Sequence, residues 1–494
     1  MQRRRSIQGM IVGLAQVCAP LAAARDPVAG GMQGAHEPRR PTGMAHARAS
    51  VEYWNQVALQ SNAIDHTPVA PGENRVFGEQ FGPPRTARVL AIVQLAVFDS
   101  VNAIVGRYPS YSGLARAASD SSIDAAVAYA AHDTLAALYP SQKPRLDHQL
   151  AVDLARLPQC RATFNGTDLG RRAAAAILAL RADDGSGYVE PLVGIDYMVS
   201  NAPGKWRPDP VSNNPLALGA YWGRVRPFVI PSVARFDLPP PPALTSDEYT
   251  AAFNEVKQLG GDGKSTPTRR TAGQTIIGTF WAYDATPYLG TPPRLFNQIA
   301  QRIASSRTKD VLELARLLAL ANVAMADSAI AIWKVKYDDG HWRPVTGVRE
   351  ADAGTGPSGL GDGNPDTRGD PYWTPLGAPA SNMSGPNFTP PFPAYPSGHA
   401  GFGAAMFHTL RRFYGTDTIA FSFVSDEFNG VTRDNRGQVR PRIERSFASL
   451  SEAEEECGQS RIYLGVHWRY DRLQGVRLGR RVADYLDEHG LVRP

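Results

Sequence analysis

The sequence predicts an all-α protein built from two helical bundles joined by long ordered loops. Three observations lead to this prediction. Apolar residues recur every three or four positions in many separate segments, which is the spacing of an amphipathic helix. Alternating apolar and polar runs, typical of strands, are nearly absent. The 40 prolines and 46 glycines predict long irregular connections between the packed elements.

The first 50 residues differ in composition from the rest, and residues 1–50 are interpreted as a lead segment. Three arginines at positions 3–5 precede a modest apolar stretch, residues 10–21, which is followed by three alanines. This order of positive, apolar and small residues is typical of a secretory signal and predicts export to the periplasm or the medium. The alternative is a disordered basic tail on a cytoplasmic protein. Residues 25–50 are rich in Gly, Pro and Arg and are expected to be disordered.

The first helical domain is expected over residues 51–244. Its helical segments are Val51–Ile64, Arg85–Ile104, Ile123–Leu138, Gln142–Leu157 and Gly166–Arg181. Ser141 and Asn165 are residue types that cap helix N-termini, and they are expected to cap the last two of these segments. Residues 184–244 are rich in Pro, Gly, Asn and aromatic residues, and they are predicted to form a long ordered connection.

The second helical domain is expected over residues 245–494. Its helical segments are Ser246–Leu259, Arg269–Tyr283, Pro293–Ile303, Thr308–Lys336, Gly398–Phe413 and Val466–Glu488. Residues 337–396 are dense in Gly, Pro, Asp and Asn and are predicted to be loop. Each helical group is expected to form a bundle around its own core. No apolar run beyond the lead segment approaches the ~20 residues that cross a bilayer, so no membrane span is expected.

Composition also limits the expected partners. The chain of 494 residues is 43% hydrophobic and carries a net charge of only +5. Its Lys and Arg residues are scattered and do not alternate with aromatic residues along a stripe, so nucleic-acid binding is not expected. Cys18 would leave with a signal peptide. Cys160 and Cys457 lack the spacing of a metal site, which leaves one disulfide or two buried free thiols as the alternatives.

The run Pro396-Ser397-Gly398-His399 is the most informative motif. The prolines before it are not helical and the residues from Ala400 onward are, so Ser397 is expected at the N-cap of a helix. A helix N-terminus presents unpaired N–H groups and the positive end of a dipole, which together attract an anion. Gly398 allows the backbone to approach that anion closely. Taken alone, the tripeptide is more often an ordinary helix cap.

Lys336 and Arg343 lie at the end of a predicted helix and just beyond it. A planar guanidinium and a point-charge ammonium that converge in this way suit an oxyanion with several negative oxygens. A solvated basic patch at a helix C-terminus produces the same pattern, because cations are favourable there.

His467 and Asp471 are four residues apart in a segment expected to be helical from Val466 onward, and Arg461 precedes them. A carboxylate at that spacing can accept from one ring nitrogen, which fixes the tautomer and leaves the other nitrogen free as a ligand or nucleophile. An isolated His–Asp pair of this kind is more often a surface pair.

Taken together, these segments resemble a signature shared by type 2 phosphatidic acid phosphatases, bacterial non-specific acid phosphatases and vanadium-dependent haloperoxidases. The resemblance is closest to the haloperoxidases. The run 390–400 is similar to the fungal chloroperoxidase segment, and Trp333 and Phe392 match positions that line the halide side of that family's pocket. Asp284, in the run 280–284, matches a carboxylate that the family pairs with its second arginine.

The resemblance implies a haloperoxidase or acid-phosphatase-like fold and a vanadate cofactor, with phosphate able to occupy the same site. His467 would bond the vanadium, and His399 would act as acid and base. Lys336 would polarise hydrogen peroxide toward attack by chloride or bromide, releasing hypohalous acid or a halogenated product. The remaining oxyanion-binding groups would be Arg343, Ser397, Gly398 and Arg461, with Asp284 and Asp471 as their supporting carboxylates. The organic acceptor is not indicated.

Two alternatives stay open. Phosphate and vanadate are nearly isosteric, so the same residues suit a soluble acid phosphatase that works through a phosphohistidine at His467, with His399 protonating the leaving group. The other alternative is a non-catalytic oxyanion-binding protein. Two imidazoles argue against it, because binding alone does not require them.

Overall fold

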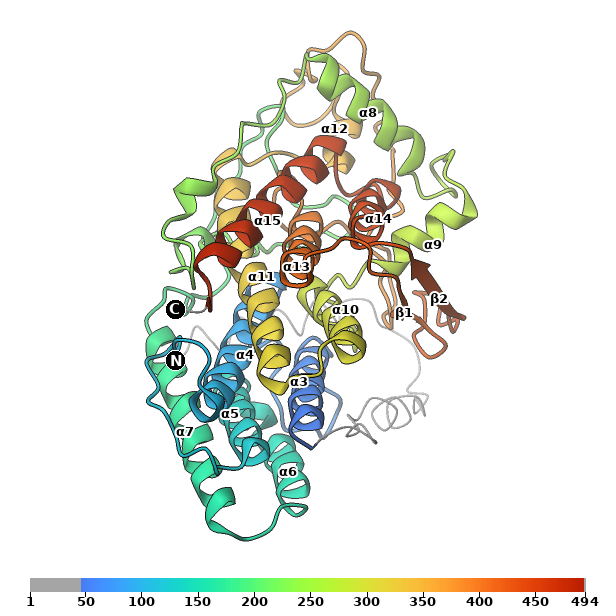
Figure 1. Ribbon diagram of the computed structural model, residues 1–494. Coiled ribbons are helices and arrows are strands. Elements are labelled where there is room, and N and C mark those ends of the chain that lie inside the picture. The colour runs from blue at the N-terminus through green and yellow to red at the C-terminus, as the bar shows by residue number, and fades with distance from the viewer. Residues whose placement is uncertain (1–45, 493–494) are drawn as a thin grey trace.

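The computed structural model describes residues 46–492, so the predicted signal, Cys18 and the prediction of export lie outside the described residues. The N-terminal helices are α3 (His46–Asp65), α4 (Pro83–Val105), α5 (Ile123–Leu138), α6 (Lys143–Leu154) and α7 (Arg161–Arg181) (Figure 1). The later elements are α8 (Asp247–Leu259), α9 (Ala272–Phe280), α10 (Pro292–Arg307), α11 (Val311–Asp339), α12 (Pro344–Arg349), α13 (Gly398–Tyr414), β1 (Phe421–Asn429), β2 (Arg442–Phe447), α14 (Leu450–Tyr463) and α15 (Arg469–His489). Short 3₁₀ turns lie at Pro140–Gln142, Trp222–Arg224 and Val233–Phe236. The described chain is therefore mainly helical, as the sequence predicts.

Several predicted helix boundaries are wrong. Residues 46–50, assigned to a disordered lead, already belong to α3. Helix α6 begins at Lys143, and the Ser141 hydroxyl donates to a Glu79 carboxylate oxygen at 2.6 Å and does not cap the helix. Helix α7 begins at Arg161, so Asn165 lies inside it. The tertiary partner of Ser141 and the early start of α7 are not visible in local sequence spacing.

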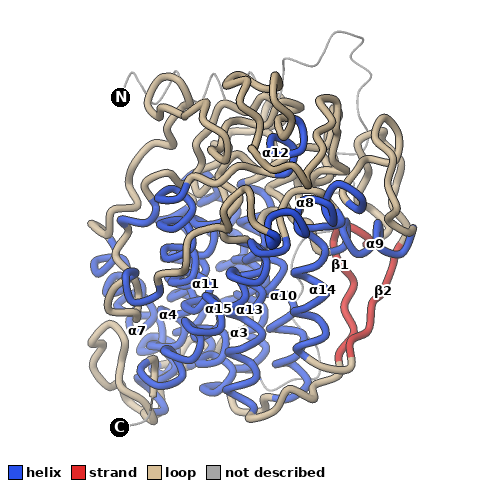
Figure 2. Tube along the Cα trace, turned by 90° about the horizontal axis from the view of Figure 1, so that it is seen from above, coloured by secondary structure: helices blue, strands red, loops and turns tan. Residues whose placement is uncertain are grey.

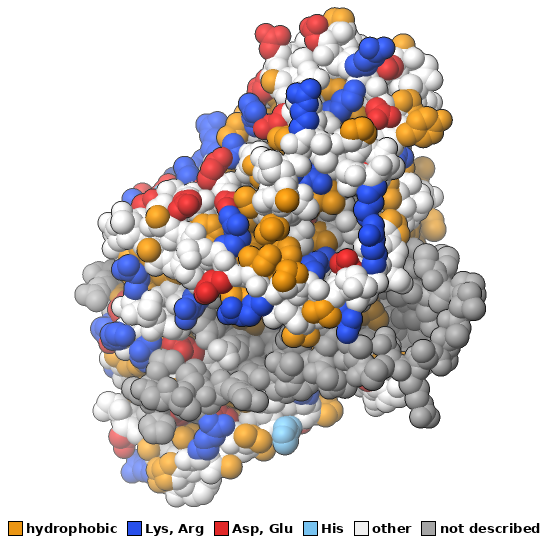
Figure 3. Space-filling model, turned by 90° about the vertical axis from the view of Figure 1, so that its right-hand side faces the viewer, with side chains coloured by type: hydrophobic (Ala, Val, Ile, Leu, Met, Phe, Trp, Pro, Cys, Tyr) orange, Lys and Arg blue, Asp and Glu red, His pale blue; other side chains and the backbone are white. Residues whose placement is uncertain are grey.

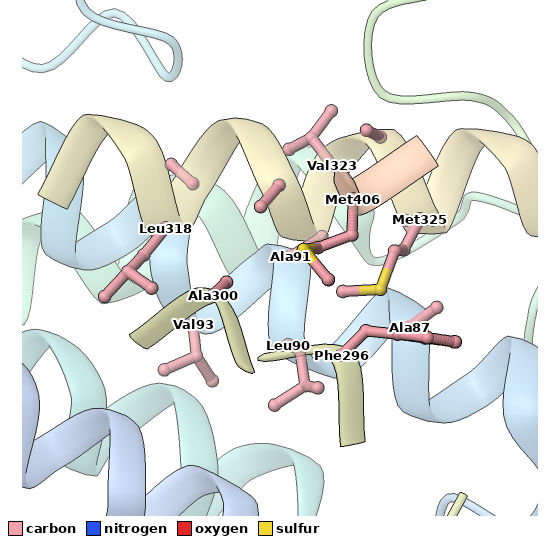
Figure 4. Close-up of a cluster of buried hydrophobic side chains, with 14 of the residues drawn as sticks. Ala87, Leu90, Ala91, Val93, Phe296, Ala300, Leu318, Val323, Met325 and Met406 are labelled. Carbon is pink, nitrogen blue, oxygen red and sulfur yellow. The ribbon is translucent and has the colours of Figure 1, made fainter. Parts of the chain in front are cut away.

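The two helical groups share one core. Figure 4 shows apolar side chains of α4, α10, α11 and α13 meeting one another, among them Leu90, Phe296 and Met406. The principal buried cluster contains residues from both predicted domains, so the expectation of a separate core for each group is wrong. Helices α4 and α11 are buried along nearly their whole length, and each packs against helices of both groups.

Helices α4 and α11 contradict the expectation that no apolar run beyond the lead segment is long enough to cross a bilayer. By length and composition, α4 and α11 are long and apolar enough to cross a membrane. In both helices, 94% of the apolar window is buried inside the protein. Their apolar character is accounted for by their place in the centre of the core.

Loops gather on one side of the helical layer, where the short helix α12 lies among them (Figure 2). Helix α13 packs closely against α15, and glycines on α15 make this approach possible. A Cβ atom at Gly475 would lie 2.5 Å from the carbonyl oxygen of Ser397, and one at Gly479 would lie 2.3 Å from that of Gly401. The close packing brings the start of α13 next to the start of α15.

Helices α12 and α14 and an antiparallel hairpin, β1–β2, were not predicted. The buried face of α14 carries polar residues, including Glu454, Ser460 and Arg461, so its apolar residues do not show helical spacing. Strand β1 likewise buries Ser425 and Glu427. An apolar-spacing argument misses elements whose buried faces are polar.

The face drawn in Figure 3 carries charges of both signs. The two cysteines among the described residues form no disulfide. Acidic, basic and hydrophobic side chains are interspersed on the face that Figure 3 draws. Cys160 and Cys457 are both free; Cys160 is exposed and Cys457 is buried. Neither of the two expected alternatives holds completely, because only one of these thiols is buried.

Candidate functional site

The predicted site residues come from five different elements and converge at the loop side of the helical layer. Lys336 lies in the last turn of α11, and Arg343 immediately precedes α12. Ser397 is the N-cap of α13, Arg461 lies in the last turn of α14, and His467 lies just before α15. Hydrogen bonds and ion pairs described below join these side chains to neighbouring segments of the site.

His467 is held between a carboxylate and a guanidinium. Its Nδ1 atom lies 2.8 Å from Asp471 Oδ2, and its Nε2 atom lies 3.0 Å from Nη1 of Arg343. A guanidinium only donates, so Nε2 carries the lone pair and the proton is on Nδ1, where Asp471 Oδ2 accepts it. Burial lowers the pKa of His467 well below its usual value, and the charges of Arg343 and Lys336 lower it further. The imidazole is therefore neutral, and its lone pair, on Nε2, is directed at the guanidinium of Arg343.

The predicted helix from Val466 is wrong, although the predicted contact is present. Helix α15 begins at Arg469, with Trp468 as its N-cap. Asp471 is the third residue of the helix, and its Oδ2 atom also accepts the backbone N–H of Trp468 at 3.0 Å. Burial raises the pKa of Asp471 to about 7, while Lys336 and Arg343 act in the opposite direction. The pair thus forms at a helix start and not along a helix face.

Arg343 is fixed by backbone carbonyls. Its Nε atom donates to Phe392 O at 2.9 Å and its Nη1 atom to Val466 O at 2.8 Å. Burial lowers its pKa to about 9, so the guanidinium stays charged at neutral pH. Nη2 is buried and has no hydrogen-bond partner among the described residues. This N–H group is available to an acceptor that enters the site.

Lys336 is fully buried, and its ammonium donates to the carbonyl oxygens of Pro393 at 2.8 Å and Ala394 at 2.9 Å. An ammonium has three N–H groups, so one remains for another acceptor. Burial lowers the pKa of Lys336 well below its usual value, and the neighbouring charge of Arg343 adds to the effect. An anion in the site would favour the charged form.

Arg461 and His399 share the carboxylate Asp284. The two terminal nitrogens of Arg461 donate to the two carboxylate oxygens of Asp284 at 3.0 and 2.8 Å. Arg461 Nε is buried and has no hydrogen-bond partner among the described residues. His399 Nδ1 lies 3.9 Å from Asp284 Oδ1, and His399 Nε2 lies 2.5 Å from the carbonyl oxygen of Ala282. A carbonyl only accepts, so the proton is on Nε2 and Nδ1 carries the lone pair.

Ser397 and Gly398 begin α13 as predicted. The Ser397 hydroxyl accepts the N–H of Ala400 at 3.4 Å, and the Ser397 N–H donates to the carbonyl of Asp471 at 2.9 Å. A Cβ atom at Gly398 would lie 3.2 Å from the Trp333 ring. The N-terminus of α13 is thereby joined to the start of α15 on one side and to an aromatic side chain on the other.

Trp333 and Phe392 form an aromatic wall beside the cations. Their ring centroids are 5.0 Å apart, and the ammonium of Lys336 lies 5.2 Å from the Phe392 ring. The guanidinium of Arg343 lies 5.0 Å from the same ring. Trp333 is fixed by a 3.1 Å hydrogen bond from Nε1 to Leu218 O. The wall therefore places apolar ring surface next to two positive charges.

Access to the site is narrow. Phe392, His399 and Asp284 are 6–8% exposed, whereas the other charged and aromatic side chains named above for the site are at most 1% exposed. The side of the site that faces solvent is therefore the one where these three residues lie. An anion that reached the cations would lose most of its water, which strengthens its interaction with them.

The donor set fits an oxyanion better than a bare metal ion. Arg343 Nη2, Arg461 Nε and the third N–H of Lys336 are buried donors that lack a protein acceptor. No group of three or more His, Cys, Asp or Glu residues in the described part of the chain is arranged to hold a metal ion. One imidazole nitrogen surrounded by cationic donors suits an anion of vanadate or phosphate geometry.

The family follows from comparison with known proteins. Two vanadium chloroperoxidase models match the chain: the N-terminal domain over residues 44–217 and the second helical-bundle domain over residues 316–490. Vanadium chloroperoxidase of Curvularia inaequalis is 33% identical over 508 aligned residues, covering 85% of this chain and 78% of that protein. The chain belongs to the vanadium chloroperoxidase family. This confirms the resemblance seen in the sequence and makes the chain an enzyme of the peroxidase class.

Solved structures of two bacterial proteins have the same fold as this chain. A bacterial vanadium-dependent iodoperoxidase has a TM-score of 0.67 at 23% identity, covering 88% of this chain and 95% of that one. The holo form of a bacterial vanadium-dependent chloroperoxidase has a TM-score of 0.61 at 17% identity, covering 87% and 96%. At these identities the likeness concerns the fold, which is confirmed.

Sequence reasoning missed the backbone groups of the site. The carbonyls of Ala282, Pro393 and Ala394 orient His399 and Lys336. Every residue type supplies a carbonyl, so no side-chain pattern marks these positions. The proline-rich run before Ser397 was the one available signal, because it lies next to the motif and contains two of the three carbonyls.

Proposed function

We propose that this chain binds vanadate and uses hydrogen peroxide to oxidise chloride or bromide to hypohalous acid or an equivalent. One observation carries the proposal: unpartnered, buried N–H groups of Arg343 and Arg461 accompany a neutral His467 whose Nε2 is the nitrogen with a lone pair. Burying such donors without an acceptor is unfavourable by about 1–3 kcal/mol each, so a bound oxyanion is the natural partner.

The residues present fit vanadate. His467 Nε2 would be the ligand to vanadium, and Arg343, Arg461 and Lys336 would neutralise its oxygens, together with Ser397 and the N–H of Gly398. When bound, vanadate supplies a Lewis acid that activates peroxide without a change of oxidation state. Phosphate has the same shape and charge range, so it should compete for the same residues.

His399 is positioned to move a proton. Its Nε2–H is directed at the carbonyl of Ala282, so Nδ1 is the nitrogen that can accept a proton given up by incoming hydrogen peroxide. Asp284, 3.9 Å from Nδ1, would stabilise the imidazolium that forms. The same Nδ1 would return a proton when hypohalous acid leaves. Burial lowers the pKa of His399 to about 3, so the imidazole begins as a base at neutral pH.

The halide is expected beside Trp333 and Phe392. A halide ion next to these rings lies close to the charges of Lys336 and Arg343, yet meets little water. Lys336 supplies its remaining N–H to polarise the oxidant toward the halide. The aromatic side chain at Phe392, which resembles the chloride-using enzymes, favours chloride as a substrate.

A direct test is reconstitution followed by assay. The purified chain would be incubated with orthovanadate and then given hydrogen peroxide, a phenolic dye and chloride, bromide or iodide. We expect vanadate-dependent halogenation that is lost in His467→Ala, with circular dichroism to confirm that the variant is folded. The absence of halogenation, together with rapid hydrolysis of a phosphate monoester by the vanadate-free protein, would instead identify an acid phosphatase.

A further inference from the structure

Strand β1 changes its pairing in the middle of the hairpin. Phe421 through Val424 pair with β2, and pairing resumes only at Asn429, so residues 425–428 leave the regular ladder. Figure 1 places β1 and β2 beside α9 and α14. Irregularities of this kind bend a strand and direct its side chains elsewhere, and they are frequent next to active sites. Here the unpaired stretch faces the segment that follows α9.

The first two residues of the stretch are bonded to the last residue of α9 and to the segment that follows it, respectively. The Ser425 hydroxyl donates to the carbonyl of Phe280 at 2.6 Å. The N–H of Asp426 donates to the Tyr283 hydroxyl at 2.7 Å. One backbone group of β1 that a regular strand would direct to a neighbouring strand, the N–H of Asp426, and one side chain, Ser425, are therefore directed at residues 280–283.

The third residue, Glu427, extends the same contact. Its side chain is fully buried, and Oε2 accepts from the Ser381 hydroxyl at 2.6 Å and from Arg440. Besides burial, Ser381 and Arg440, the groups that shift the pKa of Glu427 are the backbone N–H of Tyr283 and the carboxylate of Asp284, both in the segment after α9. Glu427 is thus in contact with the segment that carries Asp284, the carboxylate that holds Arg461.

Residues 280–285 supply the site with two groups. Ala282 provides the carbonyl for His399, and Asp284 provides the carboxylate for Arg461. Tyr283 and Ala285, on either side of Asp284, have φ angles of 49° and 63°. Side chains other than glycine rarely adopt this conformation, so the surrounding contacts have to maintain it. The predicted helix through Tyr283 ends instead at Phe280 for the same reason.

We propose that Ser425 and Glu427 are positioning residues, through which hairpin β1–β2 holds residues 280–285 so that Ala282 fixes the tautomer of His399 and Asp284 fixes Arg461. Neither residue touches the reacting atoms. The proposal extends the function proposed above and rests on it only for the effect on turnover.

The composition of β1 supports this role. If the strand served only to cover the core, apolar residues at its buried positions would be more stable than polar ones, because buried polar groups lose their hydration. Instead Ser425 and Glu427 are 0% exposed. Ser425 uses its hydroxyl on the carbonyl of Phe280, and Glu427 uses its carboxyl on Ser381, Arg440 and the backbone of Tyr283, which is the pattern of a positioning contact.

The first test compares two serines of the same strand. Ser425→Ala removes the bond to Phe280, and Ser422→Ala removes only a cross-strand bond to Ser446 at the surface. Nitrogen-15 NMR of the histidine side chains in the vanadate-free protein reports the tautomer of His399. We expect the Nε2–H form in the wild type and in Ser422→Ala, and a mixture of tautomers in Ser425→Ala. An unchanged His399 tautomer in Ser425→Ala would refute the proposal.

The second readout is anion binding and turnover. Losing one hydrogen bond that holds the loop should weaken vanadate binding about fivefold in Ser425→Ala, because Asp284 orients Arg461 less well. In the loaded enzyme, kcat should fall by a similar factor while KM for halide is unchanged, because Trp333 and Phe392 lie on other elements. A fall in melting temperature with unchanged vanadate affinity and kcat would show a purely structural role.

Two variants at Glu427 supply the conservative comparison. Burial raises the pKa of Glu427 to about 7, so the uncharged carboxyl is well populated at neutral pH. Glu427→Gln preserves an acceptor for Ser381 and Arg440 and should weaken vanadate binding less than Glu427→Leu. Glu444→Gln, at an exposed position of β2, is the charge-matched control. Equal losses in the Gln and Leu variants would contradict a positioning role that depends on the acceptor.

These readouts separate the two proposals. If the wild-type protein fails to halogenate but the His399 tautomer still changes in Ser425→Ala, the proposed function fails and the positioning role stands. If halogenation is observed and the tautomer, affinity and kcat are all unaffected by Ser425→Ala, the positioning role fails alone.

Discussion

Nε2 of His467 lies 3.0 Å from a terminal nitrogen of Arg343, at the point where the buried cations of the site converge. The carboxylate of Asp471 occupies the other ring nitrogen, so Nε2 keeps its lone pair. The guanidinium can only donate, so it stabilises the tautomer of His467 whose lone pair is on Nε2. The first two predictions examine the two sides of this arrangement.

Arg343→Lys should weaken vanadate binding about ten- to a hundredfold, the effect of losing a charge-assisted buried hydrogen bond. A lysine ammonium cannot reach the carbonyls of Phe392 and Val466 and also extend a planar fork toward an anion. Equilibrium dialysis with vanadate would measure the loss. Arg368→Lys, at an exposed position, is the control. Affinity equal to that of the wild type would show that Arg343 does not bind the oxyanion.

Asp471→Asn should weaken vanadate binding about ten- to a hundredfold, the usual effect of removing a partner of a ligating histidine. Nδ1 of His467 and the N–H of Trp468 both lie within hydrogen-bond distance of Asp471 Oδ2, so an amide oxygen at that place can accept both bonds, but without the negative charge that strengthens them. Nitrogen-15 NMR should show the proton of His467 still on Nδ1, so the weaker binding would reflect the lost charge. Glu488→Gln, exposed on the same helix, should leave vanadate affinity unaltered.

Vanadate or phosphate affinity should increase as pH falls from 8 to 5. Burial and neighbouring arginines lower the pKa of Lys336 and His399 in the free protein. An anion offsets those charges and raises both pKa values, so binding takes up protons and lower pH favours it. In His399→Ala the increase in affinity should be smaller. Because protonation of the anion itself affects both proteins equally, the difference between them reports the contribution of His399. Identical pH dependence in the two proteins would exclude His399 as a linked group.

Phe392→His should lower kcat/KM for chloride more than for bromide, by about tenfold, or 1.4 kcal/mol, in the ratio. Chloride is the more strongly hydrated halide and gains more from the dry ring surface beside Lys336. The measurement is the halogenation rate against concentration for each halide. Phe164→His, 61% exposed, is the control. A parallel fall for both halides would remove Phe392 as a determinant of selectivity.

His66 should make stability depend on pH independently of the site. It is buried, its Nε2 atom accepts the N–H of Gly82 at 3.0 Å, and burial lowers its pKa to about 4. Between pH 6.5 and 4 the unfolded chain binds a proton there that the folded chain does not, so stability falls as pH decreases, by up to about 1.4 kcal/mol per pH unit. His66→Gln should show a shallower slope in chemical denaturation than the wild type.

The control for this experiment is His148→Gln, at an exposed position of α6. Its free energy of unfolding should follow the wild-type pH dependence. A His66→Gln slope equal to that of the wild type would mean that His66 takes up its proton in the folded state as readily as in the unfolded one.

Local periodicity predicted the long helices and failed where polar residues face inward. Helix α5 has the predicted bounds, and Ser397 caps α13 as predicted. Helix α14 and strand β1 bury Glu454 and Glu427, whose ionic partners Arg480 and Arg440 come from elsewhere in the chain. A buried charge with a distant partner has no signal in its own neighbourhood, so these elements were not predicted.

The order and spacing of Lys336, Arg343, Ser397–His399, Arg461 and His467 were sufficient to indicate an oxyanion site and the family, because a reactive pocket needs particular side chains. The tertiary structure alone determined how those side chains are oriented. The carbonyls of Ala282, Pro393 and Ala394, and a hairpin that leaves its ladder at Ser425, select the tautomer of His399 and the free N–H of Lys336. Backbone groups are the same at every residue, so their contribution becomes specific only when the folded chain brings them within hydrogen-bond distance.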